Sequence, residues 1–262
     1  DRSVSRGLGD VYKRQVSCWG DSMMFGIGAG EAYVFGEDNV LDISDWTTPY
    51  TLEYLTGIKV YNLGVAGETS NEIALRQGGI KMYADNTFEV GYDDSVEISI
   101  IDEYGNPVYM ADFSAYGYVE PHESDVVYIN DDMFKITGTE ETGLYICRYS
   151  EEEDVYDAFT TVYEGTQIVT KAAHERKNDI LILEIGSNGG WDNYRQLISQ
   201  YDAMIQNAGC DYFIIVGDTD DPGTSIADTA QGFRNDDGTY VGVGDTAWEA
   251  TLREAYGCLL YT

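Results

Sequence analysis

The sequence 179-DILILEIGSNGG-190 opens with a nearly continuous apolar run and ends in glycine, serine and asparagine. Unbroken apolar runs are typical of strands that are covered on both faces of a parallel sheet. Small polar residues directly after such a strand mark the end of the sheet at which open α/β folds bind their ligands. Residues 179–185 are therefore expected to form a central strand, and the turn after it to form part of a site.

Strands and helices alternate on both sides of this run. The expected elements, in chain order, are strand 16–19, helix 45–55, strand 58–62, a helix that Thr69 or Ser70 caps and that ends near 77, strand 179–185, helix 193–207, strand 212–216 and helix 246–256. This alternation predicts a three-layer α/β/α domain with a parallel sheet.

Residues 80–170 have a different pattern. Short segments rich in Val, Ile and Tyr are separated by turn signals at 105–107 and 130–132. The expected strands are 96–101, 108–113, 125–129, 133–136 and 143–149. We expect an antiparallel, sandwich-like β insertion that divides the α/β core into a first part, 16–79, and a second part, 171–257.

The two ends of the chain differ from the rest. Residues 1–15 are net basic in an otherwise acidic chain, and residues 258–262, CLLYT, have no polar ending. Both resemble translated adaptor sequence that flanks reading frames assembled from metagenomic reads. We expect both ends to be artefactual tails outside the fold. The alternative is an ordinary N-terminus and a short apolar C-terminal strand.

Composition narrows the classes of partner. The chain has 15 Lys and Arg against 47 Asp and Glu, a net charge of −32. Such a field repels phosphate backbones and anionic lipid, so neither nucleic acid nor a membrane surface is an expected partner. No apolar run approaches the roughly 20 residues that a membrane span needs. The four cysteines form no CxxC pair and no metal-like cluster with the two histidines, so no metal or organic cofactor is expected.

Three polar turns each follow an expected strand: GDS at 20–22, NLGVAGETS at 62–70 and GSNG at 186–189. A sharp turn exposes the serine hydroxyl of the first. A glycine in the second lets a backbone N–H approach a reacting carbonyl, and the asparagine in the third supplies a side-chain N–H. Together these groups would make a nucleophile beside an oxyanion hole. Three unrelated polar turns are the alternative.

The three turns resemble blocks I, II and III of the SGNH (GDSL-like) hydrolase family, in the family's order. The resemblance covers 16–78 and 171–257. It implies a flavodoxin-like core, with Ser22 as the nucleophile and with the N–H of Gly67 and the side chain of Asn188 as oxyanion donors. The backbone N–H of Ser22 is expected to contribute as well.

The sequence departs from the family pattern at two points. Gly189 follows Asn188, where the family usually has Asp. The family's last block, Asp-x-x-His, has no counterpart, because neither His122 nor His174 has Asp three positions earlier. His122 is expected in a loop and His174 on a helix surface. We therefore expect a chain that stops before its catalytic histidine and is nearly inactive.

The expected activity is carboxylic-ester hydrolysis in a bacterial protein, with a small-molecule or glycan acyl ester as substrate. The resemblance makes glycan deacetylation plausible. The rival is a non-catalytic carbohydrate-binding or surface-interaction protein that uses the aromatic β insertion. No secretory leader opens the sequence, and a secreted or cell-surface location is favoured.

Overall fold

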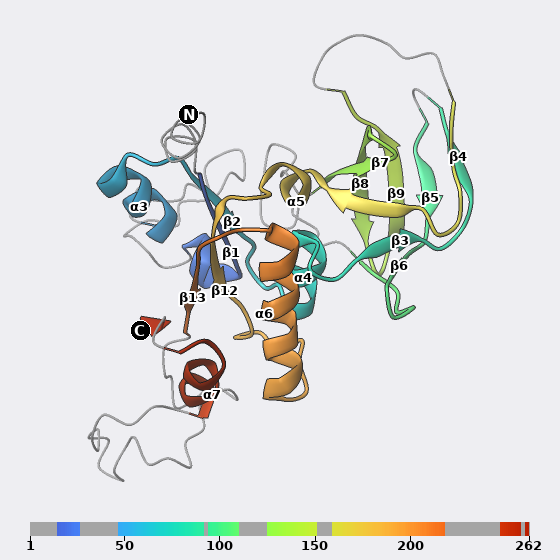
Figure 1. Cartoon of the computed structure of the whole chain (residues 1–262). Helices are drawn as coiled ribbons and strands as arrows, with labels where there is room; N and C mark the ends of the chain where they lie inside the picture. The colour runs from blue at the N-terminus through green and yellow to red at the C-terminus, as the bar shows by residue number, and fades with distance from the viewer. Residues whose placement is uncertain are drawn as a thin grey trace, which may run out of the picture.

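The chain folds into two parts, a parallel sheet with its helices and a region of antiparallel strands (Figure 1). The computed structural model describes residues 15–26, 47–91, 94–109, 125–150, 159–217, 247–257 and 260–261. Among the described helices, none has the length and apolarity that crossing a bilayer demands.

The parallel sheet has five strands in the order β14-β13-β12-β1-β2. Their bounds are β1 Val16–Gly20, β2 Val60–Gly64, β12 Ile180–Glu184, β13 Phe213–Val216 and β14 Leu260–Tyr261. All neighbours run parallel. In the register of the central strands, Cys18 lies opposite Ile182 on one side and Asn62 on the other. The prediction of a parallel sheet in an α/β protein is confirmed, with strand bounds displaced by one or two residues.

Two residues of the segment expected to lie outside the fold belong to this sheet. Leu260 pairs with Ile215, and Tyr261 pairs with Val216. This pairing agrees with the alternative of a short C-terminal strand. The adaptor origin of 258–262 stays a prediction, and residues 1–14 lie outside the described ranges.

The bounds of the helices are α2 Ser22–Phe25, α3 Thr48–Thr56, α4 Ser70–Gln77, α5 Lys171–Glu175, α6 Tyr194–Ala208 and α7 Ala247–Tyr256. Helices α4, α6 and α7 begin within one residue of their expected starts, whereas α3 begins three residues after the expected 45. Thr69 caps α4 in a capping box with Glu72, and Gly78 ends the helix in the left-handed conformation. The four-residue α2 was not expected.

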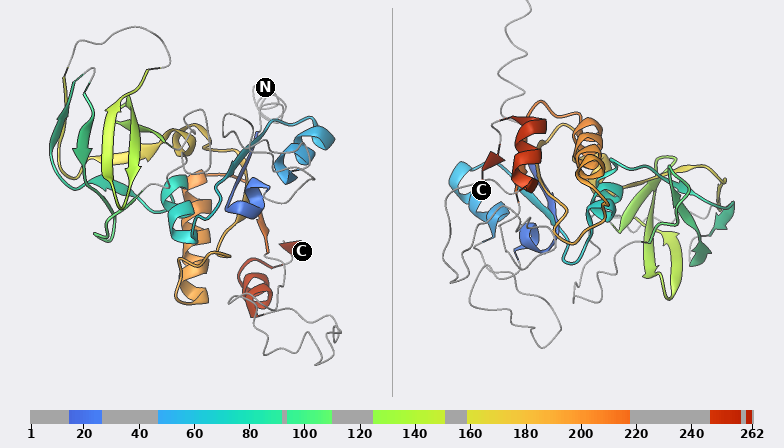
Figure 2. Two further views of the ribbon diagram at one scale, coloured as in Figure 1. Left: turned by 180° about the vertical axis from the view of Figure 1, so that it is seen from behind. Right: turned by 90° about the horizontal axis from the view of Figure 1, so that it is seen from below.

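Helices lie on both faces of the parallel sheet (Figure 2). Trp19 of β1 and Leu183 of β12 belong to a buried cluster that also contains Tyr201 of α6. The neighbouring strand positions point the other way, so Cys18 packs with Met24 of α2 and with the partly buried Leu52 of α3.

Burial makes Cys18 the least reactive of the described thiols. The side chain is 0% exposed, and desolvation raises its pKa from the ordinary 9.0 to about 12. At pH 8 the thiolate fraction of Cys18 is therefore about a thousandfold below that of a free thiol. We expect iodoacetamide to alkylate Cys18 only after unfolding, as peptide mass spectrometry would show.

The same shift predicts a pH dependence of stability. The unfolded chain loses the Cys18 proton at lower pH than the folded chain does, so the free energy of unfolding falls as pH rises from 9.0 toward about 12. Cys18→Ala removes this contribution to the slope. Alkylation of native Cys18 at the rate of a free thiol would contradict both expectations.

The antiparallel strands form one large sheet, β5-β9-β8-β7-β11-β3-β6, and the pair β10-β4. Their bounds are β3 Met82–Ala84, β4 Phe88–Val90, β5 Val96–Ile98, β6 Ile100–Asp102, β7 Val126–Ile129, β8 Asp132–Thr139, β9 Gly143–Arg148, β10 Thr160–Val162 and β11 Gln167–Thr170. The predicted antiparallel structure is present, but the large sheet curls nearly into a barrel instead of forming a sandwich (Figure 1).

A two-residue turn joins β7 and β8 of this sheet into a hairpin. Asn130 and Asp131 both have positive φ, 52° and 70°, in the tight loop that joins β7 to β8. A two-residue hairpin loop with both φ values positive matches the right-handed twist of its strands. Of the expected strand 108–113, residues 110–113 lie outside the described ranges. Val108 and Tyr109 are not in a strand.

Candidate active site

The three predicted turns meet at one end of the parallel sheet. Adjacent parallel strands β1, β2 and β12 all end there, and hydrogen bonds join the turns that follow them. The Val65 N–H donates to the Gly20 carbonyl at 3.0 Å, and the Ser70 N–H donates to the Gly189 carbonyl at 3.0 Å. The side-chain amide of Asn188 donates to the Glu68 carbonyl at 3.0 Å. The turns are therefore in direct contact.

Ser22 is the first residue of α2 and is half-buried. Asp21 caps this helix, because its carboxylate accepts from the Met23 N–H at 2.9 Å. Its other carboxylate oxygen accepts from the Ser187 hydroxyl of the third turn. Within the described ranges, the Ser22 hydroxyl has no hydrogen-bond partner. The hydroxyl is thus uncommitted, while the residue before it is fixed to the neighbouring turn.

Two residues of the second strand hold α2 close to the sheet. Asn62 donates from its amide to the Phe25 carbonyl at 3.1 Å, and its amide oxygen accepts from the Gly64 N–H at 3.1 Å. A Cβ on Gly64 would lie 2.7 Å from the Phe25 Cα and 2.8 Å from the Met24 carbonyl carbon. The backbone that carries Ser22 therefore packs directly on β2, which only glycine at 64 permits.

Gly67 lies at an exposed turn and has a φ of +85°. Its neighbour Glu68 is buried and receives the Arg76 Nε at 3.0 and 2.9 Å and the Arg76 Nη2 at 2.7 Å. Burial raises the pKa of the Glu68 carboxyl, and the guanidinium of Arg76 opposes that rise. The buried Glu68–Arg76 ion pair therefore fixes Glu68, the residue directly after Gly67, whose backbone N–H is the predicted oxyanion donor.

Asn188 is exposed in a turn that depends on glycine. Gly186 and Gly189 have φ values of +112° and +82°, and the Gly189 N–H donates to the Gly186 carbonyl at 3.0 Å. The left-handed conformation at 189 favours glycine at the position where the family has Asp. One N–H of the Asn188 amide is used by Glu68, and an amide NH₂ carries two hydrogens. The second N–H can bind an oxyanion.

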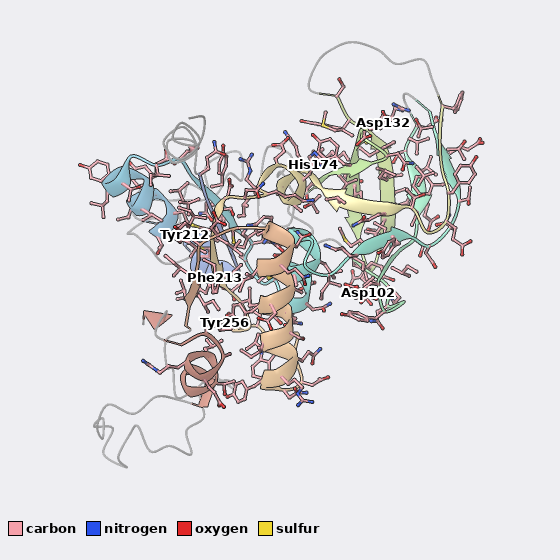
Figure 3. The ribbon with its side chains drawn as sticks, in the orientation of Figure 1. Asp102, Asp132, His174, Tyr212, Phe213 and Tyr256 are labelled. Carbon is pink, nitrogen blue, oxygen red and sulfur yellow. The ribbon has the colours of Figure 1, made fainter. Side chains whose placement is uncertain are left out.

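The structure separates His174 from Ser22. His174 is exposed on α5 (Figure 3). Its ring centroid lies 4.4 Å from that of Tyr128 in the antiparallel sheet. α5 precedes β12, whereas Ser22 follows β1. Because these strands are parallel, the two residues lie at opposite ends of a five-residue strand, roughly 16 Å long. His122 falls outside the described ranges.

Sequence reasoning gave no role to three polar residues that join these elements: Glu68 and Ser187 within the turns, and Arg76 on α4. Arg76 could have been suspected, because it follows Ile73 by three positions and so lies on the buried face of α4. The contact between Asp21 and Ser187 had no such local signal. Across the described residues, no group of three or more His, Cys, Asp or Glu side chains could hold a metal ion.

Comparison with known proteins found no matching protein-family model, no matching curated protein and no matching solved structure.

Proposed function

We propose that this protein is a serine-dependent carboxylic-ester hydrolase of the SGNH type, with Ser22 as nucleophile. The observation that carries the proposal is the joining of the three turns: Ser187 bonds to Asp21, and Asn188 bonds to Glu68. An uncommitted hydroxyl therefore shares one sheet edge with two N–H donors, as nucleophilic catalysis with an oxyanion hole requires.

The arrangement of the parallel sheet supports the same proposal. Counted along the chain, its five strands lie in the order 2-1-3-4-5, which is the flavodoxin-like order. Helices α4 and α6 pack on one face and α2 and α3 on the other. A three-layer, flavodoxin-like core is the architecture that the SGNH family would supply.

In the proposed reaction, the Ser22 oxygen attacks the acyl carbonyl and its proton passes to a general base. The negative charge on the carbonyl oxygen is held by the N–H groups of Gly67, Asn188 and Ser22. The alcohol leaves with a proton from that base, and water then releases the acid from Ser22. The family resemblance assigns the base to histidine. Within the described ranges no histidine lies at this edge.

The antiparallel sheet favours a glycan as the alcohol part of the substrate. Phe159 and Tyr163, on either side of β10, are 74% and 66% exposed, and Tyr145 of β9 is also exposed. Flat aromatic faces in solvent suit stacking on sugar rings. The same residues would serve the rival function, glycan binding without catalysis.

Chemical rescue tests the hydrolase proposal. Imidazole can serve as an external general base beside Ser22, and a general base contributes about 10²–10⁴ in rate. With a short-chain aryl ester, we expect hydrolysis by the wild-type chain to rise with imidazole to at least about tenfold above that of Ser22→Ala. His174→Ala, the matched control, should equal wild type. Equal rates for wild type and Ser22→Ala at every imidazole concentration would contradict the hydrolase proposal.

A further inference from the structure

Glu68 makes two connections that meet beside the proposed oxyanion hole. Its side chain binds Arg76 through three contacts of 2.7–3.0 Å. Its backbone carbonyl accepts the Asn188 side-chain N–H at 3.0 Å. Glu68 also directly follows Gly67. Both donors other than Ser22 are therefore positioned relative to this one residue.

Arg76 is in turn fixed to the rigid part of the fold. Its Nη2 donates to the Leu63 carbonyl of β2 at 2.7 Å, and its guanidinium lies 5.1 Å from the ring of Trp19 in β1. Its own carbonyl accepts from the Thr170 hydroxyl at 2.6 Å. The Arg76 side chain is 2% exposed. The ion pair thus fixes the turn at 67–68 relative to the central strands β1 and β2.

Backbone and capping bonds hold the two ends of the turn. After β2 ends, the Glu68 N–H donates to the Val65 carbonyl in a long hydrogen bond of 3.3 Å. On the far side, Thr69 is fixed by Glu72, which accepts from both its N–H and its hydroxyl at 2.8 Å. Between these points, the contacts of the Glu68 side chain with Arg76 anchor the turn to the core.

We infer that the buried Glu68–Arg76 pair is a positioning device that holds the N–H groups of Gly67 and Asn188 at the spacing that one oxyanion requires. The catalytic part of this inference rests on the proposed function. Buried ion pairs are weak sources of stability compared with apolar packing, so a positional role accounts for this one better. A displacement of about 1 Å in such a site can cost about a hundredfold in rate.

Two substitutions of the pair test the inference. Glu68→Gln keeps the size of the side chain and removes its charge, whereas Arg76→Lys keeps the charge and loses the fork that binds both carboxylate oxygens. Glu53→Gln is the matched control, because Glu53 forms an exposed ion pair with Lys59 at 3.1 Å. Leu144→Ala, buried in the antiparallel sheet, controls for lost stability alone.

The first readout needs no activity. In ¹⁵N–¹H spectra we expect Glu68→Gln and Arg76→Lys to shift the side-chain amide signals of Asn188 and the backbone amide signal of Gly67, with no such change in the controls. The second readout is imidazole-supported turnover, in which kcat should fall about a hundredfold at nearly constant KM. Should either folded variant keep the wild-type Asn188 and Gly67 signals, the inference is wrong.

The two proposals fail in different ways. If these signals move while wild type shows no Ser22-dependent turnover, the positioning role stands and the hydrolase proposal falls. If wild type turns over and kcat is unchanged in both variants, the hydrolase proposal stands and the positioning role falls.

Discussion

Arg76→Met should lower the free energy of unfolding by about 3–5 kcal/mol, because it leaves the Glu68 carboxylate buried without a partner. The two side chains are 2% and 3% exposed, so water cannot replace the lost guanidinium without opening the structure. The backbone carbonyl of Leu63 also loses its donor. Urea denaturation followed by circular dichroism measures the loss.

The double variant Glu68→Gln, Arg76→Met tests the cause. It removes both charges, so it should recover much of the stability that the single change loses, and the cycle should show strong coupling between the two positions. Glu53→Gln, in the exposed pair with Lys59, supplies the comparison and should change the free energy of unfolding far less, because water screens an exposed pair. An Arg76→Met effect as small as that would show that the pair contributes no more than a surface contact.

Gly64→Ala should destabilise the fold by about 3 kcal/mol and displace the nucleophile. The new methyl would lie 2.7 Å from the Phe25 Cα and 2.8 Å from the Met24 carbonyl carbon. Both are backbone atoms, which cannot move aside as a flexible side chain can, so α2 must shift away from β2. Because Ser22 begins α2, imidazole-supported turnover should fall by about a hundredfold.

Gly57→Ala separates crowding from backbone conformation. Gly57 has a φ of +67° at the end of α3, and a Cβ there would meet no atom within 4 Å. We expect a cost of about 1 kcal/mol and unchanged turnover. Thermal unfolding and the ester assay on both variants make the comparison. If Gly64→Ala is no worse than Gly57→Ala, the close approach of α2 to β2 is not rigid.

Residues within one short window predicted most elements of the α/β part, with α2 and β14 as exceptions. Thr69 and Glu72 form a complete capping box, and Gly78 ends the helix. The apolar run 179–185 contains the central strand β12. These signals work because a cap, a period or a turn depends on neighbours along the chain. The three-residue strands β3, β4 and β10 carried no such signal, since so short a strand is defined by its partner.

The three turns, and their order after three strands, could be read from the chain alone, because each is a local change from apolar to small polar residues. The contacts that join the three turns could not be predicted from the chain alone. The contact between Asn188 and Glu68 spans 120 positions, and that between Ser187 and Asp21 spans 166. Pairing over such distances depends on which strands become neighbours and how they are aligned, and the sequence pattern contains neither. Arg76 likewise becomes buried beside Glu68 only when β1, β2 and α4 pack together. A charged side chain is stable in a core only when it is paired with an opposite charge there.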